Sequence, residues 1–161
     1  MTNRVACQAS DIYAAFAPVS GLYTPHGAEL WPSTGYECKP NGPVPVLHMH
    51  GLRDPIVPYA GRKSFGFPPV REYIQGWARR NSIAPGINAT RTYSHKTVQC
   101  ESWGEGRANV TLCTAAEAGH SWPGAPTPAC PSFGPFKCTR DINATDHIWA
   151  FFERYTLHTG N

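Results

Sequence analysis

Hydrophobic positions in this chain form short runs separated by stretches rich in proline, glycine and polar residues. Residues 14–21, AAFAPVSG, form an apolar run that ends in Ser-Gly, and this pattern predicts a buried strand. Residues 44–51, VPVLHMHG, carry β-branched residues and stop at a glycine, which predicts a second strand. The intervening residues 22–43 are rich in Pro, Gly and Ser, so we expect a loop there.

Apolar residues at helical spacing predict two amphipathic helices. Residues 67–81 begin with two prolines that suit a first helical turn, and their apolar residues share one face: Val70, Ile74 and Trp77. Residues 144–158 repeat the pattern with Ile148, Phe151, Phe152 and Tyr155. Either Asn143 or Thr145 can cap this helix.

The segments between these helices predict two more strands, residues 90–103 and 108–116, joined by the glycine-rich turn GEGR. The predicted order along the chain is helix, strand, helix, strands and helix. This alternation indicates an α/β fold with a mostly parallel sheet and flanking helices. The length of 161 residues fits a single domain.

Composition narrows the possible functions. A hydrophobic content of 41% and an aromatic content of 12% are typical of a globular protein. The net charge is only +3 and the basic residues form no stripe, which argues against nucleic acid as a partner. No apolar run is long enough to span a bilayer, so we expect no membrane partner either.

Six cysteines without any C-x-x-C pair favour disulfides over a zinc site. Cys130 and Cys138 bracket a proline-rich loop, and Cys100 and Cys113 fall on two predicted hairpin strands. We therefore expect these two bridges and a third between the remaining pair, although six cysteines allow many other pairings. The remaining pair is Cys7 and Cys38.

Three N-x-S/T sequons, at Asn88, Asn109 and Asn143, are candidate glycosylation sites. Together with the cysteines they predict a secreted, extracellular protein. The first residues, MTNRVACQASDIY, have neither the apolar region nor the cleavage site of a signal peptide. We therefore expect the sequence to begin partway through a longer protein.

Two residues that follow predicted strands are candidates for catalysis. Asp54 lies three residues after Gly51, and His120 lies in GHSWPG after the strand 108–116. Each alone also fits an ordinary turn. As a pair, an acid followed by a histidine has the chain order of the second half of a Ser-Asp-His triad. Such a histidine takes the serine proton while the carboxylate holds its tautomer.

Five blocks of sequence carry a resemblance to a known family. They are MTNRVACQASDIYAAFAPVSG, VPVLHMHGLRDPIVPYAG, GWARRN, GHSWPG and ATDHIWAFF. Together they resemble secreted serine esterases of the α/β-hydrolase fold, in particular feruloyl esterases grouped with polyhydroxybutyrate depolymerases and acetyl xylan esterases. The resemblance implies that Asp54 is the triad acid, that His120 is the base, and that Trp122 borders the substrate cleft. It implies no cofactor.

The chain departs from this family in one respect, because it contains no G-x-S-x-G nucleophile elbow. We therefore expect an incomplete, C-terminal part of an α/β-hydrolase domain that is inactive alone. The resemblance favours a feruloyl ester of plant cell-wall arabinoxylan as substrate for the whole enzyme. The alternatives are a polyhydroxybutyrate depolymerase, an acetyl xylan esterase, or a catalytically inactive secreted binding protein.

Two other groups of residues have alternative roles. His48 and His50 alternate along a predicted strand and so share a face, where they are a possible metal pair, although the hydrolase resemblance argues against it. Aromatic residues in or near loops can stack on a sugar or a phenolic acid, or pack in the core. They are Tyr23, Trp31, Tyr36 and Tyr59.

Overall fold

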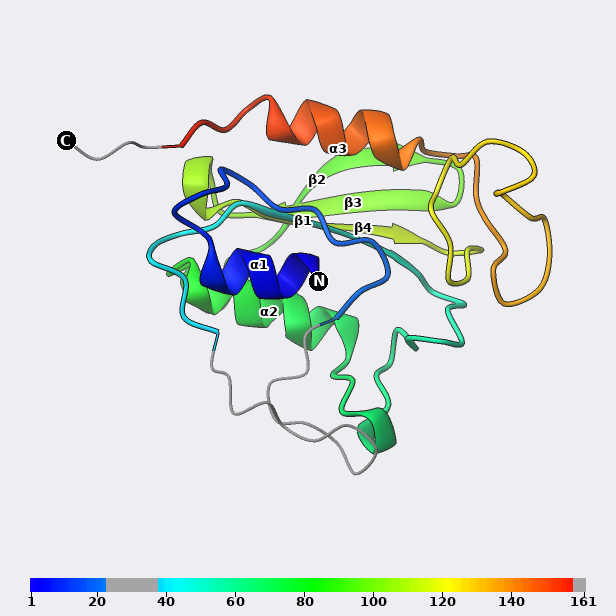
Figure 1. The fold of residues 1–161 in the computed structure, drawn as a ribbon, viewed down its shortest axis with the longest axis horizontal. Helices are drawn as coiled ribbons and strands as arrows, with labels where there is room; N and C mark the ends of the chain where they lie inside the picture. The colour runs from blue at the N-terminus through cyan, green and yellow to red at the C-terminus, as the bar shows by residue number, and fades with distance from the viewer. Residues whose placement is uncertain (23–37, 158–161) are drawn as a thin grey trace.

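A computed structural model describes residues 1–22 and 38–157 of the protein and shows helices on both faces of one four-stranded sheet (Figure 1). Helices α1 (Thr2–Gln8) and α2 (Val70–Arg80) cover one face, and α3 (Ala144–Phe152) covers the other. In spatial order the strands are β1 (Val46–Gly51), β4 (Val110–Ala115), β3 (Val98–Trp103) and β2 (Thr90–His95). Two short 3-10 helices, Lys63–Phe65 and Gly106–Ala108, lie in the connections.

The sheet is mixed, whereas the sequence predicted a mostly parallel one. Strand β1 pairs in parallel with β4, but β3 is antiparallel to β4, and β2 is antiparallel to β3. The difference arises because residues 90–103 form two strands instead of one. A turn at Lys96, whose φ of 46° lies in the left-handed region, folds β3 back on β2.

The predicted strand 14–21 is an extended segment beside β1 with interrupted pairing. Phe16 lies opposite Val46, and Val19 lies opposite Met49, both in parallel. The Phe16 amide donates to Pro45 and the Ser20 amide donates to Met49. Pro18 stands midway between these two donors and has no N–H, so the ladder lacks its middle bond.

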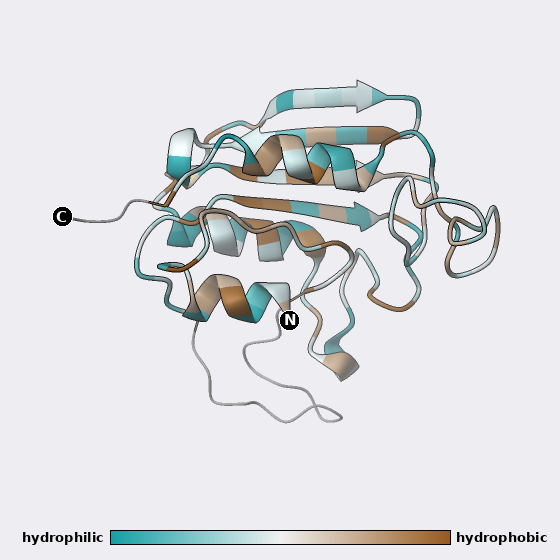
Figure 2. Cartoon of the chain, turned by 45° about the horizontal axis from the view of Figure 1, so that its top comes forward, coloured by the Kyte–Doolittle hydropathy of each residue, from teal (hydrophilic) through white to brown (hydrophobic). Residues whose placement is uncertain are grey.

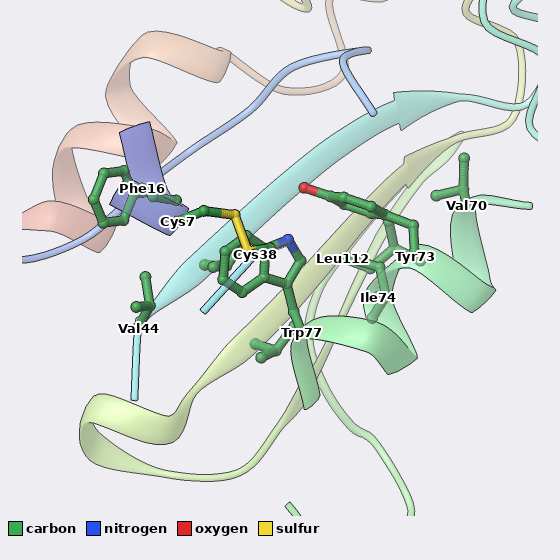
Figure 3. Packing of buried hydrophobic residues seen from close by; sticks show 12 residues of the cluster. Cys7, Phe16, Cys38, Val44, Val70, Tyr73, Ile74, Trp77 and Leu112 are labelled. Atoms are coloured by element: carbon green, nitrogen blue, oxygen red, sulfur yellow. A yellow bond between two sulfur atoms is a disulfide. The ribbon is translucent and has the colours of Figure 1, made fainter. Parts of the chain in front are cut away.

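One hydrophobic core fills the space between the sheet and the pair α1 and α2 (Figure 3). Trp77 of α2 lies at its centre with 1% of its surface exposed, next to the Cys7–Cys38 disulfide. The predicted face of α2 is buried as expected. Its two prolines precede the helix instead of forming its first turn, and Pro69 is the N-cap residue.

A second core lies under α3, where Ile148 and Phe151 are buried against the sheet. Asn143 caps this helix by accepting hydrogen bonds from the amides of Thr145 and Asp146 at 3.0 and 3.4 Å. The helix ends at Phe152, earlier than predicted, and Tyr155 packs on the same core from beyond its end.

Three disulfides join the pairs expected from the sequence: Cys7–Cys38, Cys100–Cys113 and Cys130–Cys138. Cys100 and Cys113 stand directly opposite each other on β3 and β4. Three such bridges fit a secreted protein. Strand β2 forms the polar edge of the sheet, which Figure 2 colours mainly pale and teal. No helix within residues 1–22 or 38–157 has the length and hydrophobicity that crossing a membrane requires.

Candidate active site

The parallel pairing of β1 and β4 brings Asp54 and His120 together. The last paired residues of the two strands are Gly51 and Ala115, so both following loops start at the same edge of the sheet. The amides of the first loop reach the end of β4 and the second loop, since Leu52 donates to Ala115 and Arg53 donates to Ala118, both at 3.0 Å. His120 Nδ1 lies 2.8 Å from Asp54 Oδ2, at hydrogen-bond distance.

Asp54 is buried, with 4% of its surface exposed, and both oxygens of its carboxylate have hydrogen-bond partners. Oδ1 accepts hydrogen bonds from the amides of Ile56 at 2.9 Å and Val57 at 2.8 Å, which closes a tight turn after β1. Oδ2 is therefore free to accept from His120.

His120 is held mainly through its backbone. Its amide donates to the carbonyl of Pro135, and the preceding amide of Gly119 donates to Lys137, both at 2.8 Å. The Cys130–Cys138 disulfide closes the loop that supplies these carbonyls. The imidazole is 33% exposed. Because Nδ1 contacts the buried carboxylate, Nε2 is the nitrogen left to exchange a proton with a reacting group.

Gly51 permits the close approach of the two loops. A Cβ at this position would lie 2.2 Å from the carbonyl oxygen of Ala118 and 2.5 Å from that of Gly119. The Arg53 amide donates to the same Ala118 oxygen at 3.0 Å. A side chain at residue 51 would therefore push the histidine loop away from the acid loop.

His48 and His50 share a face of β1, as the sequence predicted, but their geometry does not suit a metal pair. His48 Nε2 and His50 Nδ1 lie 2.9 Å apart and bond to each other, while His50 Nε2 lies 2.8 Å from the carbonyl oxygen of Val57. These contacts occupy three of the four ring nitrogens. Cys100 and Cys113 also lie near His147, but as a disulfide they offer no thiolate to a metal.

Two aromatic side chains lie near His120. Trp122, expected at the cleft, is 45% exposed, and its indole N–H donates to the hydroxyl of Thr145 at 3.1 Å. Phe136 was not predicted from the sequence. Its ring stands edge-on to that of His120 with centroids 6.4 Å apart, and it is 51% exposed.

No pattern in the sequence points to Phe136, because its position depends on hydrogen bonds that the carbonyls of its two neighbours accept from Gly119 and His120. Tyr59, another candidate for substrate stacking, is half-buried and packs edge-on against His50, with centroids 5.9 Å apart. Tyr23, Trp31 and Tyr36 lie outside the described residues.

The three sequons differ in their surroundings. Asn88 is exposed in the connection between α2 and β2. Asn143 is exposed, but its side chain caps α3. Asn109 is 9% exposed, its amide nitrogen donates to Gly104 and its side-chain oxygen accepts from Thr111. A glycan on Asn109 would have to displace these contacts.

Comparison with known proteins finds similarity to two proteins named as esterases. No protein-family model matches the chain. Feruloyl esterase B from Piromyces equi is 28% identical over 130 residues, which cover 75% of this chain and 23% of that protein. The putative esterase NocK from Nocardia uniformis subsp. tsuyamanensis is 28% identical over 157 residues, which cover 82% of this chain and 42% of that protein. The chain thus spans less than half the length of either relative.

The approach of the two loops can be tested with Gly51→Ala. We expect this change to lower the free energy of unfolding by about 2–3 kcal/mol, because the new methyl group would overlap two carbonyl oxygens. Gly42→Ala is the matched control, since a Cβ there would have no atom within 4 Å. Urea denaturation of both variants measures the difference, and equal midpoints would contradict the close approach.

Glycan occupancy should follow the burial of the three sequons. Expressed in a eukaryotic secretory host, the protein is expected to carry a glycan on Asn88 and none on Asn109. Peptide mapping by mass spectrometry, before and after removal of N-glycans, measures occupancy at each site. A fully occupied Asn109 in the folded, disulfide-bonded protein would be inconsistent with its buried position.

Acid should destabilise the protein through its buried histidines. Burial lowers the pKa of His48 well below 6.5, and burial also lowers the pKa of His50. Below about pH 6.5 the unfolded imidazoles bind protons that the folded ones do not, so stability falls as the pH falls. Each such imidazole contributes a slope of at most about 1.4 kcal/mol per pH unit.

The slope can be measured by urea denaturation between pH 7 and pH 5. His48→Gln removes one buried imidazole and should flatten the dependence. His95→Gln, on the exposed edge strand β2, should leave it unchanged. If the wild-type protein and His48→Gln lose stability with the same slope, the folded state does not exclude protons from His48.

Proposed function

We propose that the chain is part of a secreted carboxylic ester hydrolase in which His120 is the general base and Asp54 the acid of a Ser-Asp-His triad. The observation that carries the proposal is the 2.8 Å contact between His120 Nδ1 and Asp54 Oδ2. The carboxylate is buried, whereas the imidazole is 33% exposed. This asymmetry suits a triad, because the acid must stay fixed while the base must reach the substrate.

The chemistry needs a nucleophile that these 161 residues do not offer in a G-x-S-x-G elbow. We infer that the serine comes from a part of the enzyme outside this sequence, as the partial coverage of both relatives allows. The domain would then be one portion of an α/β-hydrolase fold. Strands β1 and β4 and their loops supply its acid and base.

The reaction would proceed in two stages. The serine proton moves to His120 Nε2 as Oγ attacks the ester carbonyl, and Asp54 stabilises the resulting imidazolium. His120 then gives this proton to the alkoxide as it departs, and the acyl group remains bound to the serine as an acyl-enzyme. Water, deprotonated by the same imidazole, attacks the acyl group, and the second proton returns to the serine as the acid is released.

The aromatic side chains beside the base favour a substrate with a planar acyl group. Phe136 stands next to the imidazole, and Trp122 is exposed two residues beyond it. Such rings stack on phenolic acids or sugars. A feruloyl ester of plant cell-wall arabinoxylan fits this surface, and the similarity to feruloyl esterase B from Piromyces equi supports it. The acyl esters cleaved by polyhydroxybutyrate depolymerases and acetyl xylan esterases carry no such ring.

Hydrolysis of methyl ferulate by the full-length protein that contains this chain tests the proposal. We expect His120→Ala to lower kcat/KM by about 10³-fold or more, and Asp54→Asn to lower it by a comparable factor. His95→Ala changes an exposed histidine of β2 and is the matched control. Full activity in His120→Ala would exclude the triad.

The same assay separates the enzyme from an esterase-derived binding protein. A full-length protein that binds feruloylated arabinoxylan but hydrolyses neither it nor methyl ferulate would be such a binding module. In that case Phe136→Ala and Trp122→Ala would weaken binding, whereas His120→Ala would not.

A further inference from the structure

Two buried imidazoles that ester hydrolysis does not use lie in contact with the acid turn. His48 is 0% exposed and His50 is 2% exposed, and both extend from β1 toward the same side. Their rings stack with centroids 5.2 Å apart. Buried polar groups are costly unless they are hydrogen-bonded, so a pair of this kind on a fully buried strand needs a physical reason.

The hydrogen bonds fix the tautomer of each ring. The carbonyl oxygen of Val57 can only accept, so His50 Nε2, 2.8 Å away, must carry a proton. In a neutral ring His50 Nδ1 is then an acceptor, and His48 Nε2, 2.9 Å away, must donate to it. His48 Nδ1 is left as an unprotonated nitrogen, and it is the buried side-chain atom without a partner among the described residues.

This hydrogen-bonded pair of imidazoles anchors the turn that holds Asp54. Val57 is bound on both sides, because its amide donates to Asp54 Oδ1 at 2.8 Å and its carbonyl accepts from His50. His50 Nε2 also lies 3.5 Å from Asp54 Oδ2, the oxygen that contacts His120. Rotation of the carboxylate away from the base would break the Oδ1 bonds to a turn that His50 holds in place.

The two imidazoles also have to be neutral if they are to hold the turn without disturbing Asp54. Burial lowers the pKa of both imidazoles, although the hydrogen bond to Val57 and the charge of Asp54 oppose this for His50. The other titratable groups that face the pair are His120, Tyr59 and Tyr73, and burial raises the pKa of Tyr73, which therefore stays neutral. A neutral N–H can hold the turn without competing as a second cation for the carboxylate.

We propose that His50 is a positioning residue for Asp54, and that His48 holds His50 in the tautomer that this role requires. The inference rests on the proposed role of Asp54 as the acid of the site. It differs from a metal pair, because the two rings bind each other and the backbone.

Nitrogen NMR of the 161-residue chain, with its disulfides intact, tests the tautomers without any substitution. At pH 7 we expect His48 and His50 both to be neutral with the proton on Nε2. A proton on Nδ1 of His50, or a charged ring at either position, would overturn the proposal. Because this measurement uses the wild-type chain, the proposal stays open to refutation even where a variant fails to fold.

Substitutions then test the effect on the acid. His50→Leu removes the donor to Val57, whereas His50→Gln places an amide N–H near the position of Nε2. We expect His50→Leu to broaden or abolish the Nδ1-bound proton signal of His120 and to speed exchange of the Val57 amide about tenfold. His50→Gln should restore both signals, and His95→Gln, on β2, should change neither.

An unchanged His120 signal in a folded His50→Leu protein would overturn the positioning role, and so would a lost signal that His50→Gln does not restore. These signals are independent of turnover. If the full-length protein hydrolysed no ester while the tautomers and the His50 effects were as expected, the proposed function would fail and the physical coupling of His50 to Asp54 would stand.

Discussion

The candidate site depends on the parallel pairing of β1 with β4. In a parallel pair both carboxyl ends lie at one edge, so the loops that follow emerge side by side although Asp54 and His120 are far apart in the sequence. Gly51 makes the approach close enough for a hydrogen bond, because any side chain there would overlap the histidine loop. The pairing of two buried strands and one glycine thus sets the distance between the acid and the base.

Once the loops meet, each side chain is fixed by a different means. Asp54 accepts hydrogen bonds from backbone amides. One of these amides belongs to Val57, whose carbonyl is bound by the His50 imidazole of β1. The backbone around His120 donates hydrogen bonds to carbonyls of another loop, which the Cys130–Cys138 disulfide closes. The acid is therefore buried within the sheet edge, and the base stands on a separately stabilised loop at the surface. A hydrolase needs this division between a rigid carboxylate and an accessible imidazole.

The sequence predicted those parts of the fold and site that depend on local pattern. The helices at Val70–Arg80 and Ala144–Phe152, the strands at Val46–Gly51 and Val110–Ala115, and the positions of Asp54 and His120 after those strands follow from spacing and turns. The hairpin at Lys96 was missed because residues 90–103 show one continuous β-type pattern, and the turn is visible only in the backbone. The position of Phe136 beside His120 depends on residues distant in sequence, which no local pattern encodes.

The geometry also limits where a nucleophile can act. Nδ1 of His120 contacts the buried carboxylate, so proton transfer must pass through Nε2 on the partly exposed side of the ring. Phe136 flanks that ring edge-on, and the disulfide-closed loop fixes both at once. A substrate that reaches Nε2 therefore meets an aromatic surface whose position is coupled to that of the base. In the proposed esterase, movement of this loop would change substrate contact and proton transfer together, so the loop would influence both specificity and rate.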